Sequence, residues 1–492
     1  MKNKISAIIE NITMYSLIIY TNLLFIIKST DSDIFFDIRS AKDLIEYGLD
    51  FKDHMSFIEG LKYTYHHLLY DLLIYPIYQL WGVQAIFILM FIVSSILFIV
   101  IYHFLKNKTN NKYISIIVTL IITGTSGCFL MPKAKVVSYL LLFLQFIVIN
   151  NLYTKGKIKY SIISVLLSVL LVNLHYSLWI FIPVFYLPYL AQMIYSFIKS
   201  KTKIKLLDHK VFAEKCSNSK LFIITFVIIL LSCFISPYGF LPYTFMFDVK
   251  HYYYSVYTEI GEMGRVILID NKRALICFIY LIILLLSKKK ISMSNLCYLL
   301  GLGLVGLMAR RNVSLLLVYY FVIITWTLFE DFKFKFKFKK IRINKIIFDV
   351  SMITLLVIGF MIEAGHANIF SNYIETLETS LPNETADYII DNLDYKNAKI
   401  YNELDYGSYF SYRGIPVFVD SRLEVYLKKF NGKEDIMIQY LHMEPENLMN
   451  KYQFDYISTE GSTKMYKYMI DNDYELLYSE SDAYYLFKNN KK

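Results

Sequence analysis

The stretch IFILMFIVSSILFIVIYHFL, residues 86–105, decides the fold class of this chain. It holds 20 residues without one Asp, Glu, Lys or Arg, and a helix of about 20 apolar residues is long enough to cross the hydrocarbon core of a bilayer. Lys106 and Lys108 follow directly, and basic residues beside a span mark its cytoplasmic end. The stretch therefore predicts a transmembrane helix that ends inside the cell.

The rest of the chain has the same apolar character. Of its 492 residues, 56% are hydrophobic, whereas ordinary soluble domains contain roughly 45–50% apolar residues. Similar apolar runs occupy Val136–Ile149 and Leu221–Ile235. The first apolar stretch, Met14–Ile27, is followed by charged residues without a small-residue cleavage pattern, which indicates a retained span. We therefore expect a polytopic α-helical membrane protein, and an ordinary soluble enzyme is excluded.

The net charge of +10 is distributed unevenly. The last 129 residues, Ala364–Lys492, carry 21 acidic and 13 basic residues, so the basic excess lies in residues 1–363. Lys and Arg that cluster in loops between spans report orientation, and we expect no nucleic-acid partner. The loops predicted to be cytoplasmic on this ground lie at residues 106–112, 155–159, 199–220, 288–290 and 333–345.

Placing these loops inside predicts about 11 spans, a cytoplasmic N-terminus and a C-terminal domain outside the cytoplasm. The transmembrane domain then comprises residues 1–363, with a long first outer loop at 29–82, and the extracytoplasmic domain comprises residues 364–492. The expected spans are 11–28, 84–105, 113–131, 136–153, 160–174, 176–198, 221–236, 273–287, 292–309, 314–330 and 346–363.

The segment His67–Trp81 is apolar enough to be mistaken for a span. If it crossed the membrane, the basic loop at Lys106 would lie outside, against the positive-inside rule. Its Tyr residues, Trp81 and Pro76 are typical of an interface or limit a helix. We therefore expect this segment to lie along the outer surface.

The C-terminal domain has a mixed pattern that is typical of a small α/β domain. An amphipathic helix is expected at Glu384–Leu393, and short apolar runs predict strands at Lys399–Tyr401, Val417–Val419, Phe454–Ser458 and Tyr484–Phe487. All five cysteines lie in apolar spans or in a Lys-rich loop, and this domain has none. No disulfide framework or zinc site is predicted.

Three carboxylates follow the first span: Asp31, Asp33 and Asp37. Asp31 and Asp33 alone are consistent with solvated residues that flank a span. However, Ile34, Phe35 and Phe36 follow Asp33, and these would hold its carboxylate at the membrane surface and raise its basicity by partial desolvation. Such a carboxylate can accept a proton from an acceptor hydroxyl, so Asp33 is the first candidate base.

Histidines occur at two places in the expected outer loops. His66 and His67 lie near the end of the first loop, and the spacing of His67 and Asp71 allows an i,i+4 contact that orients the imidazole. This pair alone does not make a metal site, because the sequence fixes no third ligand. His175 lies in the expected outer turn NLHY, where an ordinary interfacial role is equally consistent.

Basic residues also stand on the expected outer side, against the orientation bias. They are Lys133 and Lys135 in the loop MPKAK, and Arg310 and Arg311 in the turn ARRN. Binding of a phosphate at the membrane surface is a sufficient reason for their position. The alternative is that they extend to the head groups of the outer leaflet.

The chain resembles bacterial multi-spanning proteins of the GT-C glycosyltransferase superfamily. The resemblance rests on short motifs in a fixed order, with a C-terminal stretch similar to the outer domain of one bacterial branch of those proteins. The motifs are DSDIFFDIRSAKDLIEYG, QLWG, MPKAKVVSYLLLF, NLHYSLW, SPYGFLPY, ARRNVSLLL and, in the C-terminal stretch, NELDYGSYFSYRGIPVFVDSRLEVY. Together they cover nearly the whole chain.

The resemblance implies a catalytic Asp in the first outer loop and a sugar donor linked to a polyprenyl phosphate. Asp33 matches that carboxylate, with Asp31 as its partner in a DxD-like pair, and the third acid Asp37 leaves the choice of base open. Lys133 matches a basic or polar position after a proline, and Arg310 or Arg311 matches an Arg-Asn turn. The Trp residues that usually accompany these motifs are largely Phe or Tyr here.

In the C-terminal stretch, Asp420 and Arg422 stand at the end of an expected strand that Pro416 begins. An internal salt bridge that fixes the turn is one interpretation. The other is that this domain covers the membrane site and helps to bind the acceptor.

These patterns lead to one functional hypothesis and one alternative. The hypothesis is a transferase that moves a sugar from a polyprenyl-phosphate-linked donor to an envelope glycan, lipid or protein at the outer face of the cytoplasmic membrane. A divalent metal at Asp31 and Asp33 is compatible with this chemistry but is not required by it. The alternative is a non-catalytic scaffold or transporter for envelope polysaccharide. The chain has no Walker, GxSxG, HExxH or CxxC motif.

Overall fold

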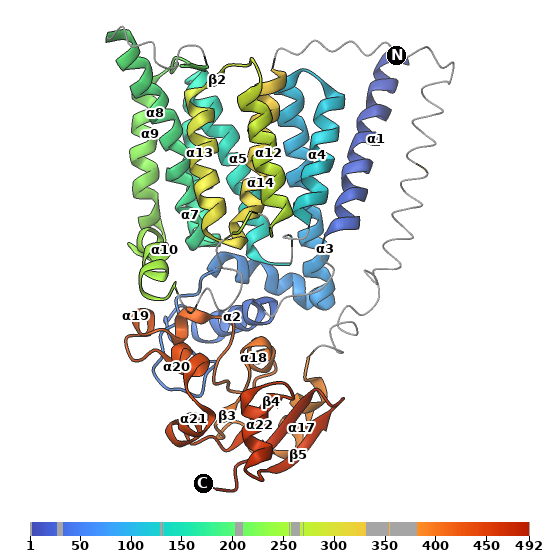
Figure 1. Cartoon of the computed structure of the whole chain (residues 1–492), viewed down its shortest axis with the longest axis vertical. Helices are drawn as coiled ribbons and strands as arrows, with labels where there is room; N and C mark the ends of the chain where they lie inside the picture. The colour runs from blue at the N-terminus through green and yellow to red at the C-terminus, as the bar shows by residue number, and fades with distance from the viewer. Residues whose placement is uncertain are drawn as a thin grey trace. The chain divides into compact units, whose positions relative to one another are not determined.

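The computed structural model of the chain is shown in Figure 1. By their contacts, its residues divide into two units. We call residues 1–28, 87–247 and 257–370 the helical unit, and residues 29–86, 248–256 and 371–492 the mixed unit. The structure describes residues 2–26, 33–127, 130, 132–201, 210–254, 256, 266–268, 270–330, 354 and 381–491.

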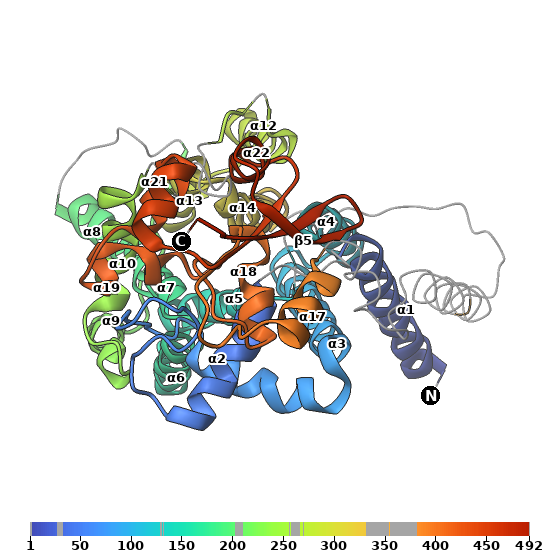
Figure 2. The same cartoon turned by 90° about the horizontal axis from the view of Figure 1, so that it is seen from below.

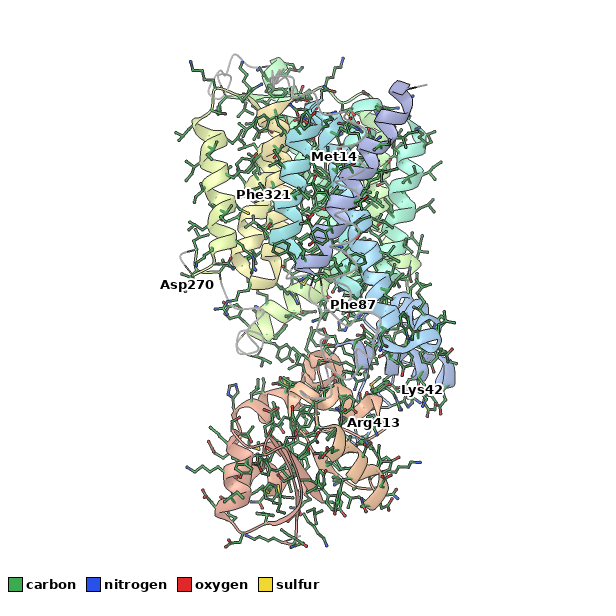
Figure 3. All side chains as sticks on the ribbon, turned by 90° about the vertical axis from the view of Figure 1, so that its right-hand side faces the viewer. Met14, Lys42, Phe87, Asp270, Phe321 and Arg413 are labelled. Atoms are coloured by element: carbon green, nitrogen blue, oxygen red, sulfur yellow. The ribbon has the colours of Figure 1, made fainter. Side chains whose placement is uncertain are left out.

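The helical unit is built almost entirely of apolar helices, as Figure 3 shows with Met14 and Phe321 on two of them. A short parallel pair of strands, β1 (Val211–Phe212) and β2 (Ile291–Ser292), joins two of its loops. The helices are α1 (Lys2–Phe25), α3 (Leu68–Thr109), which begins in the mixed unit, α4 (Lys112–Ser126), α5 (Ala134–Lys155), α6 (Ile158–Leu174), α7 (Tyr176–Trp179), α8 (Phe181–Lys201), α9 (Ser219–Leu231), α10 (Leu241–Tyr252), α12 (Lys272–Leu286), α13 (Met293–Met308) and α14 (Val313–Phe329).

Several of these helices are long enough to cross a bilayer. Among the described residues, 5 helical segments have the required length and hydropathy: Ile8–Phe25, Leu68–Thr109, Ala134–Lys155, Tyr176–Lys201 and Arg310–Phe329. Shorter apolar helices lie between them. Each span expected from the sequence up to residue 330 overlaps a helix, whereas the expected span at 346–363 lies outside the described residues except for residue 354. The total of about 11 spans stays a prediction.

Local sequence signals explain where these helices begin and end. The side chain of Asn111 accepts hydrogen bonds from the backbone N–H of Tyr113 and Ile114 at the start of α4. Asn218 and Asn271 cap α9 and α12 in the same way. Gly156 follows α5 with a φ of +59°, which a residue without Cβ adopts at little cost. Asparagine before a helix and glycine after it thus set the boundaries.

Small polar residues connect the helices inside the helical unit. Asn22 of α1 donates from Nδ2 to Ser94 Oγ at 2.8 Å and to Ser95 Oγ at 3.0 Å on α3. Ser161 of α6 and Thr225 of α9 share a hydrogen bond of 2.7 Å. Such bonds between small side chains allow close helix packing in a medium where apolar contacts alone do not drive association.

The mixed unit combines a helix of the first loop with a small sheet. Helix α2 (Asp33–Tyr47) packs on α18 (Leu404–Tyr412), and the ring of Phe35 lies 5.2 Å from those of Tyr409 and Tyr412. The sheet has the order β3-β4-β6-β5, with β3 and β4 parallel and the other neighbours antiparallel, and β5 is labelled in Figure 2. Its strands are β3 (Ile400–Tyr401), β4 (Tyr456–Glu460), β5 (Glu475–Glu480) and β6 (Tyr484–Lys488).

Short helices complete the mixed unit. They are α17 (Asn383–Asn392), the 3₁₀ turn η4 (Leu423–Tyr426), α19 (Lys428–Asn431), α20 (Ile436–His442), α21 (Pro445–Tyr452) and α22 (Lys464–Asp471). The expected helix at Glu384–Leu393 corresponds to α17, and three of the expected strands overlap β3, β4 and β6. The expected domains, 1–363 and 364–492, stay a prediction, and the contacts group residues 29–86 with residues 371–492.

The expected strand at Val417–Val419 is wrong. This buried segment makes only an isolated bridge, between Ser56 and Val417. The backbone N–H of Val417 donates to Met55 O at 3.0 Å, and Phe57 N–H donates to Val417 O at 3.3 Å. The segment therefore pairs with the first loop and not with the sheet. The sheet strand that the sequence did not predict is β5, which is mostly exposed and carries charge at both ends.

Helix α3 contains a backbone break between its two parts. Trp81 has φ −155° and ψ 36°, and Gly82 has φ 62° and ψ −155°, so neither is helical. Only glycine adopts the conformation of Gly82 without strain. The break separates the segment Leu68–Leu80 from the apolar stretch that follows, at the point where the sequence predicts a change from surface helix to span.

Gly407 is required by a close approach inside the mixed unit. A Cβ on this residue of α18 would lie 2.0 Å from the backbone oxygen of Val419 and 2.7 Å from Asn402 Nδ2. We expect Gly407→Ala to destabilise the mixed unit by about 1–3 kcal/mol, because a methyl group forced into a packed interior displaces the backbone. The thermal unfolding midpoint of the purified protein in detergent measures this.

Gly301→Ala in α13 is the matched control, since nothing lies within 4 Å of its Cβ position. Alanine there should leave the midpoint unchanged or raise it slightly, because it restricts the unfolded chain. Equal midpoints for the Gly407 variant and the wild type would show that α18 does not need this contact.

Candidate functional site

Asp33 is the first residue of helix α2, and its side chain is partly exposed. The residues that follow it, Ile34, Phe35 and Phe36, are buried and fix the helix against the rest of the mixed unit. A carboxylate at a helix N-terminus is stabilised by the helix dipole. Asp31 lies outside the described residues.

Asp37 stands one turn further along α2 and is fully buried. Its Oδ1 lies 2.8 Å from Nδ1 of His67, the residue before α3. Asp71 in the first turn of α3 is fully buried as well, and one ligand atom each of Asp37, His67 and Asp71 lie within 4.8 Å of one another. The expected pair of His67 and Asp71 therefore has a third member, which the sequence did not predict.

The ring of His67 is held on two sides. It stacks on Phe36, with ring centroids 5.9 Å apart, and it contacts the edge of Tyr70 at 6.1 Å. Burial lowers the pKa of His67, but the charge of Asp37 and the hydrogen bond to it outweigh that effect, so the pKa lies above its ordinary value. The imidazole thus has a fixed position and a fixed partner.

His66 faces a different carboxylate. Its Nδ1 lies 2.5 Å from Oε1 of Glu424, a buried residue of η4. Burial works to raise the pKa of Glu424, but the charge of His66, contact with it and the charge of Arg422 outweigh burial and hold the pKa below its ordinary value. His66 therefore makes a close contact with Glu424 that ties the first loop to the C-terminal segment.

Arg422 is buried between two carboxylates. Its Nη2 donates to Asp420 Oδ2 at 2.6 Å, and its Nη1 donates to Asp53 Oδ1 at 2.6 Å. Its guanidinium also lies 4.7 Å from the ring centroid of Tyr63. Asp420 and Asp53 strongly raise the pKa of Arg422 against the effect of burial, which lowers it. This salt bridge connects the C-terminal segment with the first loop and leaves the guanidinium 2% exposed.

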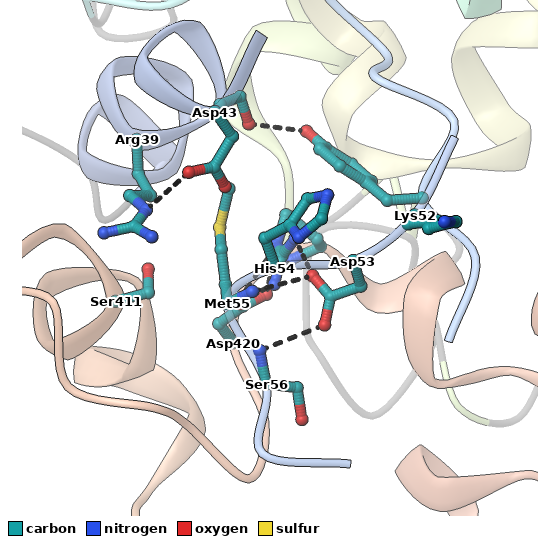
Figure 4. A network of polar contacts seen from close by, with 12 residues as sticks. Arg39, Asp43, Lys52, Asp53, His54, Met55, Ser56, Ser411 and Asp420 are labelled. Carbon is teal, nitrogen blue, oxygen red and sulfur yellow. Dashed lines mark hydrogen bonds and ion pairs between the residues drawn. The ribbon is translucent and has the colours of Figure 1, made fainter. Parts of the chain in front are cut away.

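Asp53 is held in turn by the backbone of its own loop. Its Oδ2 accepts from the Ser56 N–H at 3.0 Å, and its Oδ1 accepts from the Met55 N–H at 3.3 Å, contacts visible in Figure 4. The same view shows the ion pair of Arg39 and Asp43 on α2. Asp53 and Glu424 are not among the site residues predicted from the sequence. The only signal was the sequence KDHMS, where an Asp precedes a turn.

A further buried carboxylate, Glu403, lies next to β3. It accepts hydrogen bonds from the hydroxyl groups of Thr459 at 2.7 Å, Tyr440 at 2.7 Å and Tyr401 at 3.2 Å. Burial raises the pKa of Glu403 even though these hydroxyls favour its charged form. The neighbouring Asn402 bonds Val419 O and Phe418 N–H. The Asn-Glu motif thus organises the interior of the mixed unit.

One of the expected basic residues, Lys135, contacts the turn that carries two others. Lys133 is the residue before α5, and Lys135 Nζ donates to the backbone oxygen of Arg311 at 3.4 Å. Arg310 and Arg311 form the turn η3 (Arg310–Asn312), and Arg310 is exposed. His175 Nδ1 lies 2.9 Å from Ser138 Oγ on α5. The structure thus brings the MPKAK loop, the ARRN turn and the NLHY turn together.

The fold is similar to solved structures of the oligosaccharyltransferase of Archaeoglobus fulgidus. Its apo form matches with a TM-score of 0.52 and 10% identity, over 98% of this chain and 74% of that chain. AglB in complex with an inhibitory peptide and a dolichol-phosphate matches with a TM-score of 0.53 and 10% identity over the same shares. The form tethered with an acceptor peptide containing the NVT sequon matches with 0.51 and 9%, again over 98% and 74%.

The chain shares its overall fold with these oligosaccharyltransferase structures. No family model and no curated protein matches the sequence, and at such low identity the likeness concerns the fold alone. Together with the apolar helices, this fold makes the chain a multi-pass membrane protein. The GT-C resemblance of its sequence motifs is therefore confirmed at the level of the fold.

The pair of His66 and Glu424 predicts an acid-dependent loss of stability. Because the pKa of Glu424 is lowered in the folded state, its contribution is present above the pKa of an unfolded Glu, about 4.3, and is lost as pH falls through the folded value. We expect Glu424→Gln to cost about 1–3 kcal/mol near neutral pH, as for a buried polar contact that loses one partner. Unfolding midpoints of the two proteins between pH 7 and pH 3 measure the difference, which should shrink at the acid end.

Glu446→Gln, at an exposed acid of α21, is the control and should follow the wild type at every pH. A difference between Glu424→Gln and wild type that stays constant down to pH 3 would contradict an ionised Glu424 in the folded state.

Proposed function

We propose that this chain is a glycosyltransferase that moves a sugar from a polyprenyl-phosphate-linked donor to an envelope acceptor at the outer face of the cytoplasmic membrane. The observation that carries the proposal is Asp33 as the partly exposed first residue of a firmly buried helix, in a chain with the GT-C fold. One A. fulgidus structure holds a dolichol-phosphate and another an acceptor peptide, which supports a lipid-linked donor and a separate acceptor.

Asp33 is the general base in this mechanism. It takes the proton from the acceptor group as that group attacks the sugar, and a carboxylate fixed at a helix start needs little reorganisation to do so. Asp31 is its partner in the DxD-like pair. Asp37 is less suited to this role because it is buried and already bonded to His67.

Lys133, Lys135, Arg310 and Arg311 bind the phosphate that leaves the sugar. A cluster of cations stabilises the negative charge that develops on the leaving group, and such charge-assisted contacts are among the stronger ones in proteins. Lys135 and Arg311 are already in contact through the backbone. His175 orients the loop beside them through Ser138.

The residues of the C-terminal segment act as positioning residues. Asp420 and Arg422 fix the first loop through Asp53, and Glu424 fixes it through His66. The loop that carries Asp33 is therefore held at several points. The acceptor then binds at the exposed surface near Asp33. The guanidinium of Arg422 is buried and does not contact the acceptor.

Replacement of Asp33 tests the catalytic role. Asp33→Asn keeps the size of the side chain but removes the base, so transfer should fall about 10²–10⁴-fold while folding and donor binding remain. Product formation is measured with purified protein and polyprenyl-phosphate-linked sugars, at equal amounts of folded protein. Glu46→Gln, an exposed acid on the same helix, should leave the rate unchanged.

Full transfer by Asp33→Asn would remove Asp33 from the mechanism. If the wild type itself transfers none of the polyprenyl-linked sugars, the chain is a non-catalytic scaffold or transporter for envelope polysaccharide, and the proposed reaction fails.

The proposed orientation places the C-terminal segment outside the cytoplasm. Single cysteines at Ser462, which is exposed after β4, and at Ser200, which is exposed near the end of α8, report the two sides. In a chain with its native cysteines replaced, a membrane-impermeant maleimide should label intact cells at residue 462 and should label residue 200 only after the cells are opened. Labelling of residue 200 in intact cells would reverse the orientation.

A further inference from the structure

We infer that Asp37, His67 and Asp71 bind a divalent metal cation. The three residues come from helix α2, from the residue before α3 and from the first turn of α3. Each offers one ligand atom, and these atoms lie within 4.8 Å of one another. The inference goes beyond the proposed sugar transfer and does not depend on it, since none of the three has been assigned to the reacting groups.

The two carboxylates are buried in a way that requires either a bound cation or a shared proton between them. Asp37 and Asp71 are both 0% exposed, and two like charges at this separation strongly disfavour each other without compensation. In the described part of the chain, no hydrogen-bond donor reaches Asp71 Oδ1, Asp71 Oδ2 or Asp37 Oδ2. Asp71 therefore directs a fully buried carboxylate into the cluster, and the carboxyl group of Asp37 is the only hydrogen-bond partner recorded for it among the described residues.

The distances fit coordination of one ion. Ligand atoms at roughly 2.0–2.2 Å from a metal lie about 2.9 Å apart when they subtend a right angle, and about 4.2 Å apart when they face each other across the ion. The 2.8 Å between His67 Nδ1 and Asp37 Oδ1 matches the first case. The outer limit of 4.8 Å exceeds the second by a few tenths of an ångström, which small side-chain rotations close.

The set of ligands selects the class of metal. Two carboxylates and one imidazole offer both hard oxygen and nitrogen donors, a combination that suits Mn²⁺, Fe²⁺ or Zn²⁺ better than Mg²⁺ or Ca²⁺, which prefer oxygen alone. A doubly charged ion also balances the two carboxylates when His67 is neutral. The surrounding rings of Phe36 and Tyr70 provide the dry, rigid surroundings in which such ligands hold their geometry.

The sequence holds a matched pair that lacks the third ligand. This pair is Asp50 and His54, which are four residues apart, like His67 and Asp71. His54 Nε2 lies 2.9 Å from Asp50 Oδ2. Yet the clusters capable of holding a metal in the described residues include only Asp37, His67 and Asp71. The side chains of His54 and Asp50 are also 24% and 25% exposed, where water satisfies them. This pair serves as the internal control.

Metal binding to the purified full-length protein in detergent tests the inference. After treatment with a chelator and its removal, Mn²⁺ is added and the loss of its free EPR signal is recorded. We expect one ion to bind per chain, with nitrogen modulation from one imidazole in the pulsed EPR spectrum. Asp71→Asn and His67→Gln should each weaken binding at least 10-fold, whereas Asp50→Asn should bind like the wild type.

Three results would overturn the inference: no binding of Mn²⁺ or Zn²⁺ by the wild type at millimolar concentration, bound Mn²⁺ without a nitrogen ligand, or unchanged affinity in Asp71→Asn. In each case the two carboxyl groups share a proton instead. If the variants fail to fold, the nitrogen modulation in the pulsed EPR spectrum of the wild type tests whether an imidazole binds the ion. A failure here leaves sugar transfer by Asp33 untouched, because the measurement is of metal binding and not of turnover.

Discussion

The buried guanidinium of Arg422 is the contact on which the mixed unit depends. It lies between Asp420 of its own segment and Asp53 of the first loop, more than 360 residues earlier in the chain. Burial of one cation and two anions is costly unless every partner is in place. The backbone N–H groups of Met55 and Ser56 complete the shell of Asp53, so the first loop has one well-defined conformation when the C-terminal segment is present.

Neighbouring contacts extend the effect of the Arg422 salt bridges to the other residues of the first loop. Met55 and Phe57 of the first loop pair through their backbone with Val417, and His66 contacts Glu424, two residues beyond Arg422. Phe35 on α2 packs against the rings of α18. Helix α2, with Asp33 at its start and Asp37 inside, is therefore fixed by the C-terminal segment as much as by its own sequence.

The two candidate sites of the mixed unit have opposite physical character. Asp33 is partly exposed at a helix start, where its carboxylate is accessible to a substrate. Asp37 and Asp71 are fully buried and need a cation or a shared proton. Asp33, Asp37 and Asp71 are the same residue type, and the difference in their burial gives them different chemical roles. Asp33 is partly exposed because it is the first residue of α2, whereas Asp37 lies one turn further into the packed part of the helix and Asp71 lies in the buried first turn of α3.

The sequence by itself determined the helices, since apolar length, capping Asn residues and a glycine after α5 are local signals. It also gave Asp33 as the candidate base, the basic turns at Lys133 and Arg310, and the short strands β3, β4 and β6. Only the tertiary structure decided that Val417–Val419 pairs with Met55 and Phe57 instead of entering the sheet, and that Asp37 joins His67 and Asp71. The physical reason is that ion pairs and ligand sets join residues at any separation in the chain, whereas hydropathy and capping act within a few residues.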